Sequence, residues 1–247
     1  ELYIPLTFVS WQIDYSIAGL NPAMFHLGNL VLHILSAILV LFIIAKLTGR
    51  QWLGWLVGLL FLAHPLQTEA VAWASARKDV LSTFFMFGSI YSYLKYRSAT
   101  PDTAPFSIGL GQWRRAGDEG GHRPWLYAAS ILLFLLALLS KVSVIMLPVM
   151  LLLFDWYRRR RLGRWMIFDK IPYFGLSAIF GIVALFGKKE ILETTGTAEK
   201  ILMAFKSTLF YLQKLFVPTD LTIMYPYNEP ITIGSPDFYV PLFLVTL

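Results

Sequence analysis

Long apolar runs separated by short polar clusters make up most of this chain. A helix of about 20 mostly apolar residues is long enough to cross a hydrocarbon core of about 30 Å. Six runs reach that length or come close, at 23–45, 52–63, 80–96, 125–139, 142–157 and 167–186. The run at 52–63 is short for a full crossing unless its helix tilts. The pattern therefore predicts an all-α fold, a polytopic helical membrane protein with about six or seven spans.

A different pattern covers residues 198–217, where apolar and polar side chains occupy opposite faces of a helix. The apolar face holds Ile201, Leu202, Phe205, Leu209, Leu212 and Phe216, and the polar face holds Lys200, Lys206, Gln213 and Lys214. Residues 218–237 contain no Lys or Arg. We therefore expect both ends of this amphipathic helix to lie outside, with the helix in the outer membrane interface. A transmembrane helix is the alternative.

The runs are continuous enough to predict one transmembrane domain over residues 1–247. The segment 98–123 is rich in Gly, Pro, Ser and Thr and predicts a flexible cytoplasmic loop. The chain begins with Glu1 rather than Met and ends inside an apolar run, 238–247. We therefore expect the domain to be truncated at both ends and to be a segment of a longer protein.

The composition excludes several classes of protein. Of the 247 residues, 57% are hydrophobic and only 15% are charged, whereas a soluble domain has about 25% charged residues. An ordinary cytosolic enzyme and a disordered chain are both excluded. The absence of cysteine excludes disulfide-stapled secreted domains and thiolate zinc sites.

The basic balance of the chain indicates topology. The formal charge is +6. If the polar segment after the first run is cytoplasmic and the ends alternate, the inside segments are 46–50, 95–123 and 155–170. These carry an excess of eight positive charges, and the remaining segments carry an excess of two negative charges. This is a positive-inside distribution, so no nucleic-acid partner is needed to explain it. The run Arg158 to Arg161 fits stop-transfer anchoring, with an anionic-lipid contact as the alternative.

The predicted outer segment between the second and third runs, 64–79, is chemically dense. It contains His64 and the two carboxylates of Glu69 and Asp79, together with the adjacent cations Arg77 and Lys78. A turn between two helices needs only a few residues, so this segment is a candidate for catalysis and substrate binding. The structural alternative is that Asp79 caps the third helix and that the cations extend to the interface.

Lys141 is the next candidate, because it interrupts two apolar segments with almost no loop between them. An ionisable group at such depth costs about 2.5 kcal/mol or more and marks a functional hypothesis. An ammonium in an outer cavity suits a phosphate, and a tight turn with the lysine reaching the interface is the alternative.

His26, Asn29 and His33 fall on one face of the first span, at spacings of three and four. Two histidines seven residues apart lie about 10 Å apart along a helix, so a metal would need ligands from elsewhere. We interpret these residues as a structural polar stripe that forms interhelical hydrogen bonds, and we expect no metal and no cofactor.

Several blocks of residues resemble a known family. They are Tyr3-Ile4-Pro5-Leu6-Thr7, Leu20-Asn21-Pro22 with Phe25-His26-Leu27 and Asn29, His64-Pro65-Leu66 with Glu69 and Trp73, Arg77-Lys78-Asp79-Val80-Leu81-Ser82, Ser140-Lys141 with Pro148 and Asp155-Trp156, and Tyr225-Pro226. Together they resemble the transmembrane O-mannosyltransferases that act on cadherins and their bacterial relatives with tetratricopeptide repeats. The resemblance implies a partial GT-C fold.

The resemblance also implies an activity and its partners. A polyprenyl-phosphate sugar would be the donor and a Ser/Thr hydroxyl of a protein the acceptor, with inversion at the sugar, on the outer or lumenal face of a lipid bilayer. Arg77, Lys78 and Lys141, with Tyr225, would bind the lipid phosphate and substrate. Glu69, His64 and Asp79 would be the catalytic residues.

The sequence departs from the family in three ways. The family's catalytic acidic residue would precede Glu1. In addition, Gln67 and Ala70 stand where we expect His and Ser in the family. Finally, no tetratricopeptide period is present in the 247 residues. We expect a bacterial inner membrane, with the endoplasmic reticulum membrane as the alternative. A transporter or a non-catalytic membrane scaffold are the alternative functions.

Overall fold

A computed structural model describes residues 3–98, 124–158, 167–186, 197–219, 221 and 236–246. Every regular element in this part of the chain is helical, which confirms the all-α prediction. The chain forms two compact units, Glu1–Gly187 and Lys188–Leu247. The predicted loop 98–123 falls almost wholly outside the described residues, since only Ser98 at the end of a helix is included.

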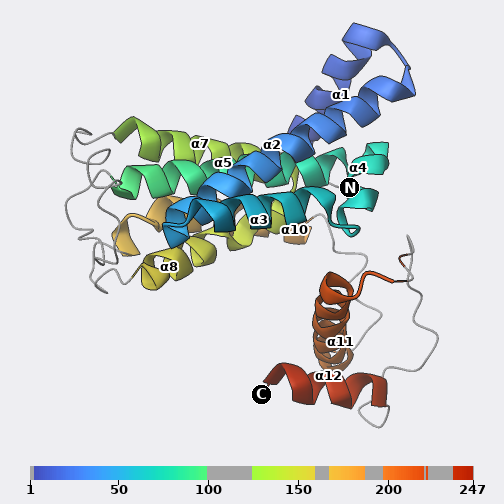
Figure 1. Ribbon diagram of the computed structural model, residues 1–247, viewed down its shortest axis with the longest axis vertical. Coiled ribbons are helices and arrows are strands. Elements are labelled where there is room, and N and C mark those ends of the chain that lie inside the picture. Colours follow the sequence, from blue (N-terminus) through green and yellow to red (C-terminus); the bar gives the residue numbers. More distant parts are fainter. Residues whose placement is uncertain are drawn as a thin grey trace. The chain divides into compact units, whose positions relative to one another are not determined.

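The first unit contains the apolar runs. Its helices are α1 (Pro5–Ala18), α2 (Pro22–Thr48), α3 (Gln51–Ala63), α4 (Gln67–Ala72), α5 (Arg77–Ser98), α7 (Pro124–Ser140), α8 (Leu147–Tyr157) and α10 (Ile171–Phe186), with short 3₁₀ turns η1 (Ala74–Ala76) and η2 (Val142–Met146). In Figure 1, α2, α3, α5 and α7 run side by side. Each predicted run coincides with a helix, except that 142–157 divides into η2 and α8 and that 167–186 is interrupted by a turn before α10 begins at Ile171.

Local sequence signals set the ends of α2. Asn21 Oδ1 accepts a hydrogen bond from the backbone N–H of Ala23 at 3.1 Å, and Pro22 occupies the first turn. At the other end, Gly49 adopts a left-handed conformation with φ of 70°, which a glycine takes without steric cost. Among the described helices, α2 alone is both long and apolar enough to cross a membrane, and α3, α7, α10 and the η2–α8 segment are shorter apolar helices. The predicted number of spans stays a prediction.

Two glycines bring α3 into close contact with α2. A Cβ atom on Gly54 would lie 2.6 Å from the backbone oxygen of Leu41, and one on Gly58 would lie 3.0 Å from Leu41 Cβ and 3.2 Å from Ala37 O. Small residues four apart allow two helix backbones to approach in this way. The α2–α3 hairpin therefore depends on Gly54 and Gly58 having no side chain.

Replacing Gly54 by alanine is expected to lower the stability of the first unit by about 1–3 kcal/mol, because the new methyl group meets backbone that cannot move aside. Thermal unfolding of the purified protein in detergent measures this. Gly175→Ala in α10 is the matched control, since its Cβ would meet nothing within 4 Å and alanine favours a helix. Equal stability of the two variants would contradict the close contact.

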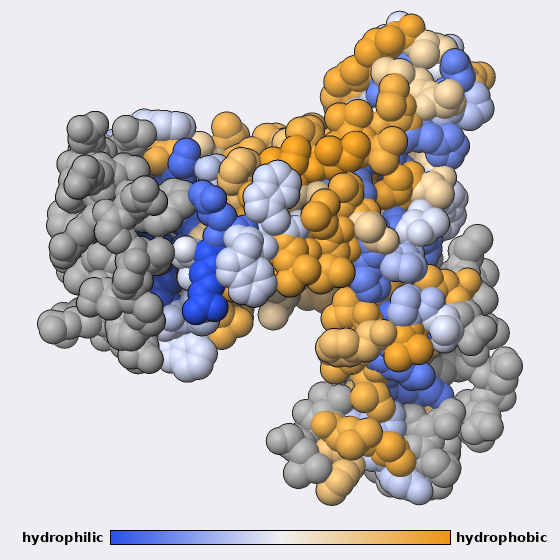
Figure 2. Space-filling model, in the orientation of Figure 1, coloured by the Kyte–Doolittle hydropathy of each residue, from blue (hydrophilic) through white to orange (hydrophobic). Residues whose placement is uncertain are grey.

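The apolar core of the first unit lies between α5, α7, α8 and α10 and includes Ile90, Phe134, Leu147 and Leu151. Figure 2 shows the outer surface over α2 and α3 as mostly apolar, with hydrophilic residues at the end where α2 passes into α3. Inside, Ser89 Oγ donates to the carbonyl of Ser130 and Ser130 Oγ donates to the carbonyl of Ser89, both at 2.7 Å. Such reciprocal bonds join α5 and α7 without exposing a polar group to the apolar interior.

The second unit contains α11 (Thr197–Phe216) and α12 (Pro236–Thr246). The first of these coincides with the predicted amphipathic helix 198–217. Leu202 and Phe238 are buried in this unit, and Lys206 Nζ lies 4.5 Å from the centre of the Phe238 ring. Tyr211, Leu212, Leu215 and Phe216 are exposed. One domain over residues 1–247 stays a prediction.

Candidate functional site

The candidate residues gather at one end of the first unit, where α2 and α5 begin and α3 and α7 end. We call this the Lys141 end. Lys141 Nζ forms an ion pair with the carboxylate of Asp79, and Thr7 Oγ1 donates to the carbonyl of Ser140 at 3.1 Å. The structure thus brings 64–79 and 140–143 together, as the alternating topology predicts.

Arg77, the first residue of α5, is buried in a network that joins three helices. Its Nη2 lies 2.5 Å from Asp14 Oδ2 of α1 and donates to the carbonyl of Phe25 at 2.9 Å. Its Nε donates to Asn29 Oδ1 of α2 at 2.6 Å. The side chains of Arg77 and Asp14 are only 4% and 9% exposed. The guanidinium is therefore held inside the protein rather than presented to a ligand.

Asp14 was not among the candidate residues predicted from the sequence. The predicted apolar runs begin at residue 23, but Pro5–Ala18 already forms α1. Thr7 and Asp14 of α1 are buried, together with Ile4 directly before the helix, at spacings of three and seven. Pro5 in the first turn and this helical spacing were the available signals, although they are weak in a segment this short.

Gly28 gives Arg77 the space to reach α2. A Cβ atom at this position would lie 2.4 Å from Arg77 Nη2 and 2.9 Å from its Cζ. Any side chain here would displace the guanidinium from its bonds with Asp14 and Asn29. The position of Arg77 therefore depends on a glycine in the second turn of α2.

The residues of the predicted polar stripe differ in burial, because Asn29 and His33 face the protein interior and His26 faces outward. Asn29 and His33 are buried, and Asn29 Nδ2 donates to the carbonyl of Trp73 at 3.0 Å. His33 Nε2 lies 3.1 Å from the carbonyl of Leu62 in α3. Because a carbonyl only accepts, Nε2 carries the proton. These contacts between segments agree with the structural interpretation of the stripe, whereas His26 is exposed.

Asp79 lies in the first turn of α5, which begins at Arg77. The structural alternative that Asp79 caps this helix is therefore wrong, because η1 runs directly into α5 and moves the start two residues upstream. The Asp79 and Lys141 side chains are each about one third exposed, at 34% and 32%. This ion pair is accessible, in contrast to the pair formed by Arg77.

The remaining candidates of this segment are more open. Lys78 is half-buried, and within the described part of the chain its ammonium forms no ion pair or hydrogen bond. Glu69 is exposed on α4 and likewise has no ion pair among the described residues. The Lys141 end therefore presents Lys78, Lys141 and Glu69, while Arg77 supports the segment from inside.

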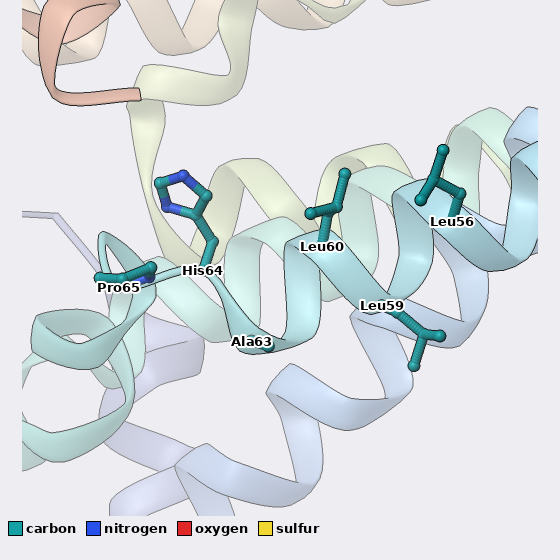
Figure 3. A pocket seen from close by; sticks show the side chains of 6 residues that line it. All are labelled: Leu56, Leu59, Leu60, Ala63, His64 and Pro65. Carbon is teal, nitrogen blue, oxygen red and sulfur yellow. The ribbon is translucent and has the colours of Figure 1, made fainter. Parts of the chain in front are cut away.

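His64 ends α3 and borders a shallow pocket of about 280 Å³. Its Nδ1 accepts the backbone N–H of Leu66 at 3.2 Å, which stabilises the turn into α4. Leu56, Leu60 and His64 are four residues apart and point to the same side of α3, whereas Leu59 points away (Figure 3). The pocket lining is almost entirely apolar, which suits a hydrocarbon chain better than a sugar.

A second polar cluster was missed by sequence reasoning and lies at the opposite end of the first unit, the Lys170 end. Lys170 is fully buried and pairs with Asp155 at the end of α8 and, at 2.9 Å, with Asp169. Tyr93 of α5 donates to Asp155 Oδ2 at 2.8 Å. Asp155 inside an apolar run was the signal that could have revealed this cluster.

Two sets of predictions are not tested by this geometry. Tyr225 and three residues of the predicted basic run, Arg159 to Arg161, lie outside the described residues. The described residues contain no group of three or more His, Cys, Asp or Glu side chains able to hold a metal ion.

Comparison with known proteins identifies related sequences. The chain is 36% identical over 96 residues to protein O-mannosyl-transferase TMTC2 of Mus musculus, covering 39% of this chain and 12% of the mouse protein. It is 32% identical over 156 residues to Tmtc2 of Drosophila melanogaster, covering 62% of this chain and 15% of the fly protein. Over these segments the chain is similar in sequence to the TMTC protein O-mannosyl-transferases.

The resemblance to transmembrane O-mannosyltransferases is thereby confirmed. The TMTC relatives also include that of Xenopus laevis, 39% identical over 113 residues, or 45% of this chain and 13% of the frog protein. The chain thus spans a small part of the curated TMTC relatives that it matches. No protein-family model matches the chain, and no solved structure matches it. These TMTC relatives come from animals, so they do not support the predicted bacterial inner membrane.

Proposed function

We propose that this chain is the membrane-embedded part of an O-mannosyltransferase that moves mannose from a polyprenyl-phosphate donor to a Ser or Thr hydroxyl of a protein. The names of its relatives support mannosyl transfer to a protein. The positive-inside distribution supports a lumenal location for the Lys141 end. Of the two membranes expected from the sequence, the animal relatives favour the endoplasmic reticulum.

One observation carries this proposal. Lys78 and Lys141 are accessible cations at the same end of a bundle of apolar helices, and the segment between α3 and α5 is fixed there by the buried Arg77. A lipid-linked phosphate places its negative charge at the depth where apolar helices end. The apolar pocket below His64 supplies a surface for the polyprenyl chain at the same end.

The chemistry assigns a role to each accessible group. The acceptor oxygen forms a bond to C1 of mannose from the side opposite the phosphate, and the bond from C1 to the phosphate oxygen breaks. Lys78 and Lys141 stabilise the charge that develops on the departing phosphate. The proton of the acceptor hydroxyl passes to a carboxylate. Of the described carboxylates at this end, Asp14 and Asp79 are already paired with cations, so Glu69 is the available one.

Replacing Lys78 by alanine in the full-length protein is expected to lower mannosyl transfer about 100-fold, since a positive charge is lost where charge develops in the transition state. Lys141→Ala is expected to have a smaller effect, because the Lys141 ammonium already forms an ion pair with Asp79 and its charge is partly neutralised. Transfer of radiolabelled mannose from polyprenyl-phosphate mannose to an acceptor protein in isolated membranes measures both.

Arg50→Gln is the matched control for these two variants. Arg50 is an exposed cation at the Lys170 end of the bundle, and its loss should leave transfer unchanged. Wild-type transfer by both lysine variants would refute the phosphate site.

A further inference from the structure

Cations from three helices converge around Lys46 at the Lys170 end of the first unit. Lys46 lies in the last turn of α2, Lys95 in the last turn of α5, and Arg158 directly after α8. Both Arg158 and Lys95 lie close enough to Lys46 to act on it electrostatically. Three like charges are brought together here by helix packing, although they are distant in the sequence.

The carboxylates in the described part of this end bond mainly to Lys170, although Asp155 also lies close enough to Arg158 to act on it electrostatically. Asp155 forms an ion pair with Lys170 and accepts a hydrogen bond from the Tyr93 hydroxyl. Asp169 forms a second ion pair with Lys170, and its carboxylate lies 3.9 Å from Arg97 Nη1. Even if each of them neutralises one cation, the described residues of this end keep an excess of positive charge. The sequence leads to the same result, since the inner segments hold eight more cations than carboxylates.

Arg158 provides a more specific signal. Its Nη1 is buried, and within the described part of the chain it has no hydrogen-bond partner. A buried guanidinium donor without a partner is unfavourable, so such a group calls for a ligand, an ion or an ordered water beside it. A phosphate group can accept two parallel hydrogen bonds from a guanidinium, and it is the anion that lipid headgroups present at a membrane surface.

We infer that Lys46, Lys95 and Arg158 form a binding site for the phosphate of an anionic phospholipid headgroup. The three groups lie where the apolar helices end, which is the depth of the headgroups in a bilayer. Arg158 supplies a planar fork of donors, and the two lysines supply point charges. The Lys95 ammonium lies 5.2 Å from the centre of the Tyr91 ring, which restricts its position.

This site rests on the membrane placement of the proposed function and does not depend on mannosyl transfer. It lies at the end of the bundle opposite to Lys78 and Lys141. A phospholipid here would secure α2, α5 and α8 to one another and to one leaflet. Failure of the transferase assay would leave this inference standing, and failure of the lipid test would leave the transferase proposal standing.

The test uses full-length protein in a neutral detergent, with short-chain phosphatidylserine and short-chain phosphatidylcholine as probes. Thermal unfolding is followed against lipid concentration. Phosphatidylserine is expected to raise the midpoint with saturation, and phosphatidylcholine is not. Lys46→Gln, Lys95→Gln and Arg158→Gln should each weaken the apparent affinity about fivefold. Lys95→Arg, which keeps the charge, should retain the affinity if the site is correct.

Two further measurements complete the test. One asks whether free phosphate can replace the lipid, and the other asks whether any loss of positive charge has the same effect as loss of the site. Inorganic phosphate that reproduces the whole shift would overturn the lipid assignment. Arg50→Gln removes an exposed cation from the same end but outside the site, and it should change the affinity less than Arg158→Gln. Equal losses in these two variants, or equal shifts with both lipids, would overturn the site.

Discussion

Replacement of Asp155 by asparagine is expected to lower the free energy of unfolding by about 3–5 kcal/mol, the usual effect of leaving a buried charge without its partner. Lys170 is fully buried, and Asp155 is its close partner as well as the acceptor of the Tyr93 hydroxyl. For a unit of this size the midpoint of thermal unfolding in detergent should fall by roughly 6–20 °C.

The double variant Asp155→Asn, Lys170→Met separates the ion pair from the rest of the cluster. Removing both charges leaves no buried ammonium that has lost its Asp155 partner, so the double variant should be more stable than Asp155→Asn alone. Asp79→Asn is a useful comparison, because its ion pair with Lys141 is about one third exposed and should contribute less than about 1 kcal/mol. A small effect of Asp155→Asn would show that Asp169, the second carboxylate on Lys170, is enough to keep the buried ammonium stable.

Arg77→Lys is expected to lower mannosyl transfer about 100-fold in the full-length protein, although the charge is kept. An ammonium cannot reproduce the bonds of Nε to Asn29 and of Nη2 to Asp14 and Phe25. Asn29 in turn donates a hydrogen bond to the carbonyl of Trp73, so the segment before α5 would shift with it. A misplacement of about 1 Å is enough for an effect of this size. Transfer kinetics in isolated membranes measure it.

Two variants control for this positioning role. Lys78→Arg keeps an accessible charge at the next position and should change transfer by less than about threefold, since it alters no buried contact. Gly28→Ala should resemble Arg77→Lys, because its methyl group would occupy the position of the guanidinium. If Gly28→Ala and Arg77→Lys both kept normal transfer, the buried network would have no role in the site.

Local signals were sufficient for the main helices of the first unit. The apolar run at 23–45 predicted α2 to within a few residues, because Asn21, Pro22 and Gly49 set its ends by local backbone chemistry. The run at 142–157 was less well predicted. It divides at Leu147 into η2 and α8, with Pro148 in the first turn of α8. Apolar periodicity alone does not distinguish a 3₁₀ turn from an α-helix.

The close approach of α2 and α3 was also present in the sequence but not recognised. Gly54 and Gly58 are four residues apart, which is the spacing of a small-residue contact between apolar helices. Which helix they contact could not be read from the chain, because that depends on the packing of α3 against Leu41 and Ala37.

The sequence by itself determined the helical class, the distribution of charge between the two ends and the set of polar residues that need an explanation. These follow from composition and periodicity, which are properties of neighbouring residues. Only the tertiary structure decided which cations are accessible. It buried Arg77 against Asp14, 63 positions away, and left Lys78 open. The physical reason is that burial and pairing depend on contacts between distant segments, and no local pattern specifies those contacts.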